Sequence, residues 1–219
     1  MAGLLAERFR LVTYDRVGWG QTTPVGDYTR TSVVEQAILT GGLLRDIGAA
    51  GVTVLGVGFG AVVALELALA EPKTIERVML IEPPLFGLVT SATEGMSSDV
   101  DEIRDAAHLG GELAAYELFL AGRLHTLGCG AGRLGESAAR GQTAAHTFLV
   151  ELPAVPAWPI DSTRLALLEA DSLVATLPST PPLLADAAER IALRIPGCER
   201  VSTLTEGPEA AAELVLRER

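Results

Sequence analysis

Residues 52–70 read VTVLGVGFGAVVALELALA. The stretch begins with an apolar run rich in β-branched residues and continues with the glycines Gly56, Gly58 and Gly60. It ends with a run of helix-favouring residues. This order predicts a strand, a sharp turn and a helix. We expect the rest of the chain to be arranged around this unit.

The turn in this stretch resembles the nucleophile elbow of the α/β-hydrolase superfamily, where a G-x-S-x-G sequence lifts a serine above the sheet. In this chain Gly58 stands at the serine position. The resemblance implies an α/β fold, with a mostly parallel sheet flanked by helices. Because glycine has no hydroxyl group, the same comparison implies that the chain is not a serine hydrolase.

A second motif lies upstream of the elbow. Residues 15–22 read DRVGWGQT and follow the alternating stretch Phe9–Tyr14, which we predict to be a strand. The motif resembles the D-x-R-G-x-G-x-S turn that follows the fourth strand of α/β hydrolases, with Val17 in place of a second basic residue. It also lies at the distance from the elbow that the superfamily shows.

The glycine cluster has an alternative interpretation. Residues 56–61 satisfy G-x-G-x-x-A, the dinucleotide fingerprint in which a helix N-terminus receives a pyrophosphate. A predicted strand over Arg77–Ile81 then ends at Glu82, near where a ribose-binding acid would lie. A dinucleotide-binding domain has no use for the motif at 15–22, so we favour the hydrolase-like fold and keep the dinucleotide reading as an alternative.

The remaining pattern predicts one domain over residues 1–219. Helical stretches near 99–108, 112–125 and 133–152 precede a predicted strand over 163–171. The resemblance implies that residues 87–158 form a helical lid, because the superfamily inserts its lid at this point. A helix over 183–195, a strand over 200–204 and a helix from Glu209 complete the prediction.

The resemblance further implies three strands ahead of Phe9–Tyr14, and the sequence begins too late to contain them. Their loss would leave an unpaired sheet edge, which favours association. We therefore expect a homodimer.

The chemistry expected of a serine hydrolase is incomplete in the sequence. Where the superfamily places its catalytic histidine, this chain has Thr205-Glu206-Gly207-Pro208. The candidate catalytic residues are Asp171 and Asp15, which we expect at the ends of strands, and His146 of the lid. Asp15 can equally brace the turn that it begins. The candidate substrate-binding residues are Gly58, Phe59, Trp19, Glu82 and Trp158.

From these observations we expect a non-hydrolytic enzyme that acts on a mostly apolar small metabolite by cyclisation, isomerisation or elimination. One alternative is a non-catalytic binding or partner protein on a hydrolase scaffold. The other is the dinucleotide-binding protein described above.

Composition limits the partners and the location. The net charge is −11 with 48% hydrophobic residues, so we expect neither nucleic acid nor a membrane as a partner. The N-terminus lacks the features of a secretory signal, which predicts a cytoplasmic protein. The two cysteines have no metal-ligand spacing, and we expect no metal site and no cofactor.

Overall fold

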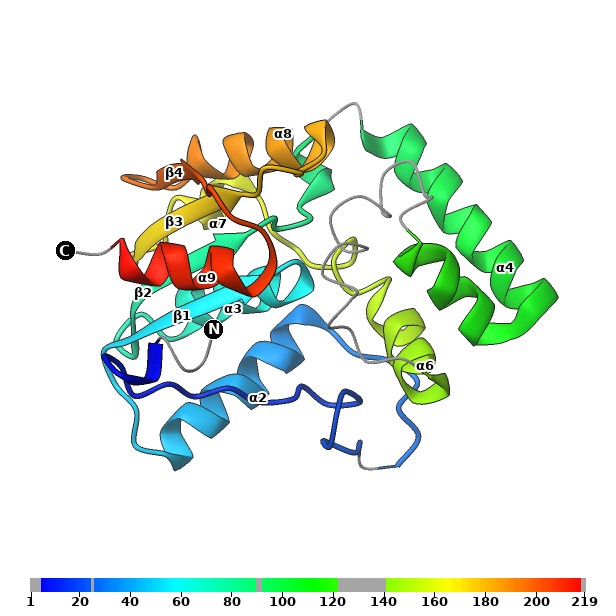
Figure 1. The fold of residues 1–219 in the computed structure, drawn as a ribbon, viewed down its shortest axis with the longest axis horizontal. Helices are drawn as coiled ribbons and strands as arrows, with labels where there is room; N and C mark the ends of the chain where they lie inside the picture. Colours follow the sequence, from blue (N-terminus) through cyan, green and yellow to red (C-terminus); the bar gives the residue numbers. More distant parts are fainter. Residues whose placement is uncertain (1–4, 25, 90–91, 122–140, 218–219) are drawn as a thin grey trace.

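The computed structural model describes residues 5–24, 26–89, 92–121 and 141–217. Within these residues, four parallel strands form one sheet in the order β1-β2-β3-β4 (Figure 1). The strands are β1 (Val52–Val57), β2 (Ile75–Ile81), β3 (Asp171–Thr176) and β4 (Glu199–Ser202). The predicted fold class, a parallel sheet flanked by helices, is confirmed.

The unit predicted from residues 52–70 is present. Strand β1 passes through Gly58, at φ 55° and ψ −123°, directly into helix α3 (Phe59–Ala70). Glycine adopts this backbone conformation without the steric penalty that a β-carbon brings. At Gly56 a β-carbon would overlap the backbone of Gly60, so glycine there allows α3 to pack closely against β1.

Helices cover both faces of the sheet. On β2, Val78 and Leu80 belong to the core cluster that contains α2 (Val33–Asp46) and α3, and also includes residues of α8 (Pro182–Ala192). The alternate residues Met79 and Ile81 belong to a second cluster with α9 (Gly207–Leu216). This alternation follows from the two-residue period of a strand.

Two of the strands predicted from the sequence are not present among the described residues. The stretch Phe9–Tyr14 belongs to no strand, because no strand in the described part of the chain pairs with it. The interval 163–171 contains the short helix α7 (Ser162–Leu165), whose first turn is capped by the Asp161 carboxylate. Leu165 and Leu168 are buried and the two residues between them are exposed, which is not the alternation of a half-buried strand.

Between β2 and β3 the chain forms η1 (Phe86–Leu88), α4 (Ala92–Leu120) and α6 (Gln142–Glu151). Helix α4 is interrupted at Gly111, where φ is 80° and ψ is 177°. In Figure 1, α4 and α6 lie on the right, beyond the carboxyl ends of the strands. The assignment of residues 87–158 as a lid stays a prediction, and we use "lid helices" below for α4 and α6.

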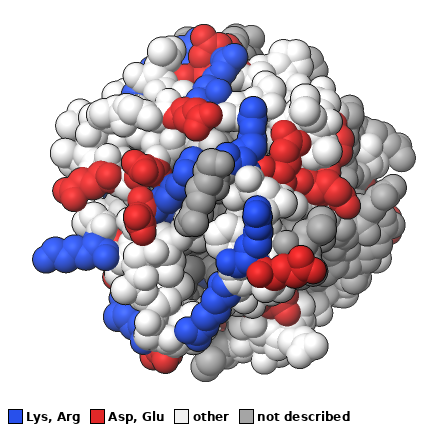
Figure 2. Space-filling view, turned by 60° about the vertical axis from the view of Figure 1, so that its left-hand side comes forward, with Lys and Arg blue, Asp and Glu red and all other residues white. Residues whose placement is uncertain are grey.

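Surface features leave several expectations untested. No helix in the described ranges is long and apolar enough to cross a bilayer. Figure 2 shows a face on which Lys and Arg side chains lie beside Asp and Glu side chains. The cytoplasmic location, the homodimer and the exclusion of nucleic acid stay predictions.

Candidate functional site

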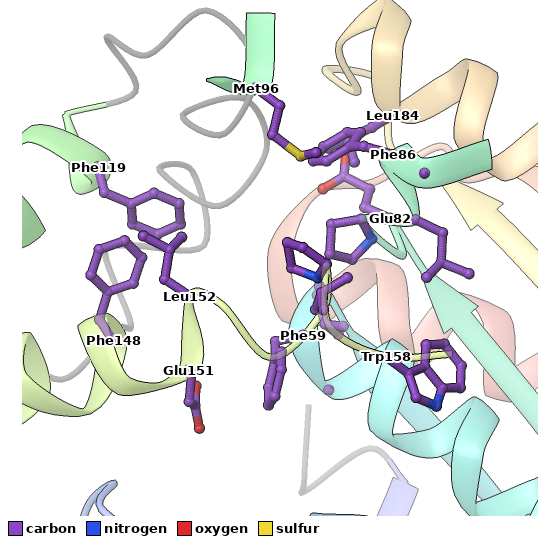
Figure 3. A pocket seen from close by; sticks show the side chains of 18 of the residues that line it. Phe59, Glu82, Phe86, Met96, Phe119, Phe148, Glu151, Leu152, Trp158 and Leu184 are labelled. Atoms are coloured by element: carbon purple, nitrogen blue, oxygen red, sulfur yellow. The ribbon is translucent and has the colours of Figure 1, made fainter. Parts of the chain in front are cut away.

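A cavity of about 680 Å³ lies between the carboxyl ends of strands β1 and β2 and the lid helices. Its wall is mostly apolar, and among the described residues that line it Arg16, Glu82 and Glu151 are charged. Figure 3 shows Phe119 and Phe148 entering from the lid helices, across the cavity from Phe86 and Glu82. A largely apolar cavity with a few charged groups is the usual form of a small-molecule site.

The elbow forms one part of the cavity wall. Gly58, Phe59 and Gly60 all line the cavity, and a β-carbon on Gly58 would meet no atom within 4 Å. The cavity therefore has room above the elbow. The N–H groups in the first turn of α3 have no acceptor within the helix, so those of Phe59 and Gly60 are available to a ligand.

Glu82 follows β2 and stands beside the elbow. The Gly58 N–H donates to the Ile81 carbonyl at 2.9 Å, and the Glu82 N–H donates to the Ala175 carbonyl at 3.1 Å. The Glu82 side chain is buried, and the Thr180 hydroxyl donates to its Oε1. Its φ is 47°, the positive value that side-chain-bearing residues seldom adopt. Such strain persists only when the surrounding structure holds it, and it concentrates at functional sites.

Glu151 connects the lid helix α6 to the loop after the N-terminal segment. Its carboxylate forms an ion pair with Arg16, including a hydrogen bond from Arg16 Nη2 to Oε2 at 3.2 Å. Trp19 Nε1 donates to Oε1 at 3.0 Å. Burial raises the pKa of Glu151, and the Arg16 charge and the hydrogen bonds from Arg16 and Trp19 oppose that rise.

The three candidate catalytic residues lie outside the described lining of the cavity. Asp171 is exposed at the start of β3, at the opposite end from the cavity, because the strand begins rather than ends there. The Asp15 carboxylate accepts from the Gln21 N–H at 3.0 Å and braces its own turn. His146 on α6 contacts Glu112 through Nδ1 at 2.9 Å and the Tyr28 carbonyl through Nε2 at 2.7 Å.

The five candidate binding residues all line the cavity, and they are Gly58, Phe59, Trp19, Glu82 and Trp158. Sequence reasoning missed Arg16, Glu151 and the phenylalanines of the lid helices. Arg16 lies inside the motif at 15–22, which could have marked it. Glu151 follows an ordinary helical pattern, and nothing in the sequence separates it from a surface carboxylate.

Comparison with known proteins finds a matching family and solved structures of similar fold. The model of the Alpha/beta hydrolase family matches residues 1–213. An alpha/beta hydrolase from Sphaerobacter thermophilus is 22% identical, with a TM-score of 0.66, over 99% of this chain and 84% of that one. A thermophilic esterase from Thermogutta terrifontis is 16% identical, with a TM-score of 0.71, over 99% and 79% of the two chains. The enol-lactonase from Burkholderia xenovorans is 17% identical, with a TM-score of 0.61, over 98% and 81%.

These findings correct the functional expectation. The matched family and structures are named for hydrolysis, so the expectation of a non-hydrolytic cyclisation, isomerisation or elimination is wrong. The same comparisons contradict the alternatives of a non-catalytic binding protein and a dinucleotide-binding protein.

Proposed function

This chain belongs to the alpha/beta hydrolase family, and from this membership we propose that it hydrolyses an ester or lactone bond with a water molecule activated by Glu82. The observation that carries the proposal is the buried Glu82 carboxyl, held at a positive φ beside the elbow in the wall of an apolar cavity. Ester and lactone bonds are the choice because two of the matched structures are named an esterase and an enol-lactonase.

Water takes the place of the side-chain nucleophile in this proposal. Gly58 stands where the superfamily has its serine, and residues 203–206, which follow β4, contain no histidine. The described lining of the cavity contains no serine, threonine, cysteine or histidine. The triad of a serine hydrolase is therefore replaced by a carboxylate that acts on water as a general base.

The proposed reaction has two steps. Glu82 takes a proton from water while the water oxygen bonds to the acyl carbon, and the carbonyl oxygen becomes an oxyanion. The N–H groups of Phe59 and Gly60 donate to that oxyanion at the start of α3, where the helix dipole also favours negative charge. The bond from the acyl carbon to the alcohol oxygen then breaks. Glu82 returns its proton to the leaving oxygen, and the products are an acid and an alcohol.

Arg16 and Glu151 have a positioning role in this proposal. Each neutralises the other, and the guanidinium carbon of Arg16 lies 4.7 Å from the centre of the Phe59 ring. A cation over an aromatic face is attracted to the ring. The ion pair thus fixes Phe59, the first residue of α3, and connects it to the lid helix α6.

The test compares two Glu→Gln variants, one at Glu82, which follows β2, and one at Glu76, which lies on β2. We expect Glu82→Gln to lower kcat by about 10²- to 10⁴-fold on esters or lactones, with little change in KM, because the amide cannot take the proton. Glu76→Gln is the matched control, since Glu76 is exposed on β2 away from the cavity. The substrates are a panel of alkyl and aryl esters and lactones. Wild-type kcat in Glu82→Gln would overturn the proposal, as would a wild-type protein that hydrolyses none of them.

A further inference from the structure

Aromatic side chains are concentrated around the cavity. The chain has five phenylalanines, three tyrosines and two tryptophans, and seven of these ten residues line this one cavity. They are Trp19, Phe59, Phe86, Tyr116, Phe119, Phe148 and Trp158. Apolar enclosure alone could have been supplied by leucine, valine and isoleucine, which are far more abundant in this sequence. The clustering of aromatic rings around the cavity therefore points to a property of the ligand.

On the side of the lid helices the rings form a continuous series. Phe119 and Phe148 have centroids 4.4 Å apart and an interplanar angle of 32°. Tyr116 follows at 5.3 Å from Phe148, and Trp19 at 6.3 Å from Tyr116 with an edge-on angle of 61°. These separations are those of interacting aromatic pairs. We call these four residues the lid-side wall.

On the opposite side, Phe59, Phe86 and Trp158 form what we call the sheet-side wall (Figure 3). The Trp158 ring is fixed, because its Nε1 donates at 2.8 Å to the buried Glu66 carboxylate. Arg164 also donates to Glu66, at 2.7 Å. A buried carboxylate with two donors holds the indole in one orientation. Trp158 is therefore preorganised within this wall.

We infer that the substrate carries a planar aromatic group, which binds between the lid-side wall and the sheet-side wall. The inference rests on the proposed hydrolysis and names the substrate class of the same cavity. An aryl group presents ring faces and edges to both walls and gains aromatic contacts beyond the burial of area. A flexible alkyl chain gains the burial alone and loses rotational freedom when it binds.

The test uses two alcohols that cannot be hydrolysed, 2-naphthylmethanol and 1-undecanol, which have the same number of carbon atoms. Isothermal titration gives the Kd of each for the full-length protein. We expect the naphthyl compound to bind more tightly, although the alkyl chain has more apolar surface to bury. Phe119→Leu should weaken naphthyl binding by roughly two- to tenfold and leave undecanol binding nearly unchanged, because leucine keeps an apolar wall without a ring.

Two further variants complete the design. Phe148→Leu repeats the test at the neighbouring ring in case Phe119→Leu does not fold, and Phe9→Leu, at a ring outside the cavity, should change neither Kd. Tighter binding of undecanol, equal losses for both alcohols in the ring variants, or no binding of either alcohol would overturn the inference. Because the alcohols report binding alone, a protein that prefers the naphthyl compound but hydrolyses no ester would refute the proposed reaction and not the aromatic site.

Discussion

Glycine is favoured at positions 56 and 58 for two different physical reasons. Gly58 has a φ of 55°, and space for a side chain is open above it. Gly56 has no such conformational demand, but a β-carbon there would overlap the backbone of Gly60. Conformation therefore favours glycine at Gly58, and packing of α3 against β1 requires it at Gly56.

We expect Gly56→Ala to destabilise the protein by about 1–3 kcal/mol, because the added methyl group must push α3 away from β1. The control is Gly87→Ala, where a β-carbon would meet no atom within 4 Å. Denaturant unfolding of both variants measures the difference in the free energy of unfolding. If Gly56→Ala were as stable as Gly87→Ala, the close approach of α3 to β1 would not limit this position.

At the scale of elements, helix α6 is tied to the loop that follows the N-terminal segment. Thr147 Oγ1 donates to the Gly18 carbonyl at 2.7 Å, and the Glu151 ion pair with Arg16 lies one turn further along the helix. His146 adds a contact to the Tyr28 carbonyl. These contacts position the helix that carries Phe148 over the cavity.

The contact between His146 and the Tyr28 carbonyl makes the attachment of α6 to the N-terminal segment dependent on pH. Both ring nitrogens of a histidine can donate only when the ring is protonated. Hydrogen bonds to Glu112 and to the Tyr28 carbonyl raise the pKa of His146 above its ordinary value of 6.5. A raised pKa in the folded state means that the stabilisation is complete below pH 6.5 and is lost as pH rises through the higher folded value.

We therefore expect His146→Gln to lower Tm more at acidic pH than at alkaline pH. Thermal melts of wild type and variant at about pH 5.5 and about pH 9 lie on either side of the histidine titration. His108→Gln, an exposed histidine on α4, is the control. The same loss of Tm at both pH values would show that His146 acts without its charge.

Local signals decided which elements could be predicted. The Ser32 side chain accepts from the Glu35 N–H at 3.1 Å at the start of α2. Such a capping contact can be predicted from a sequence, because it needs only neighbouring residues. The strand predicted at 163–171 was wrong because a short apolar run satisfies a helix and a strand equally well. The stretch Phe9–Tyr14 carries a strand pattern but pairs with no strand among the described residues. Strand pairing is a tertiary property that the local pattern does not determine.

The same distinction between local signals and tertiary packing applies to the residues of the candidate site. Gly58 and Glu82 could be located because parallel strands bring their carboxyl ends to one edge of the sheet. Phe119 and Phe148 could not, because their approach to the cavity depends on how α4 and α6 pack over the sheet. Asp171 was placed at the wrong end of its strand, since the strand boundary itself was wrong.

At the scale of the whole molecule, the cavity follows from the chain order. All four described strands run parallel, and the lid helices are inserted between β2 and β3. They therefore cover the carboxyl ends of the strands (Figure 1). Gly58 follows β1 and Glu82 follows β2 at these ends, and both line the cavity. The elbow, the carboxylate and the aromatic walls come together from segments that are far apart in the sequence.

The most direct test of the central claim follows the oxygen atom that water contributes. Hydrolysis of less than one equivalent of an aryl ester in ¹⁸O-labelled water, so that enzyme is in excess, allows mass spectrometry of both the released acid and the digested protein. Direct attack by water activated by Glu82 predicts ¹⁸O in the released acid and none in the peptide that contains Glu82. Label in that peptide, or an acyl group attached to the protein during turnover, would contradict the account.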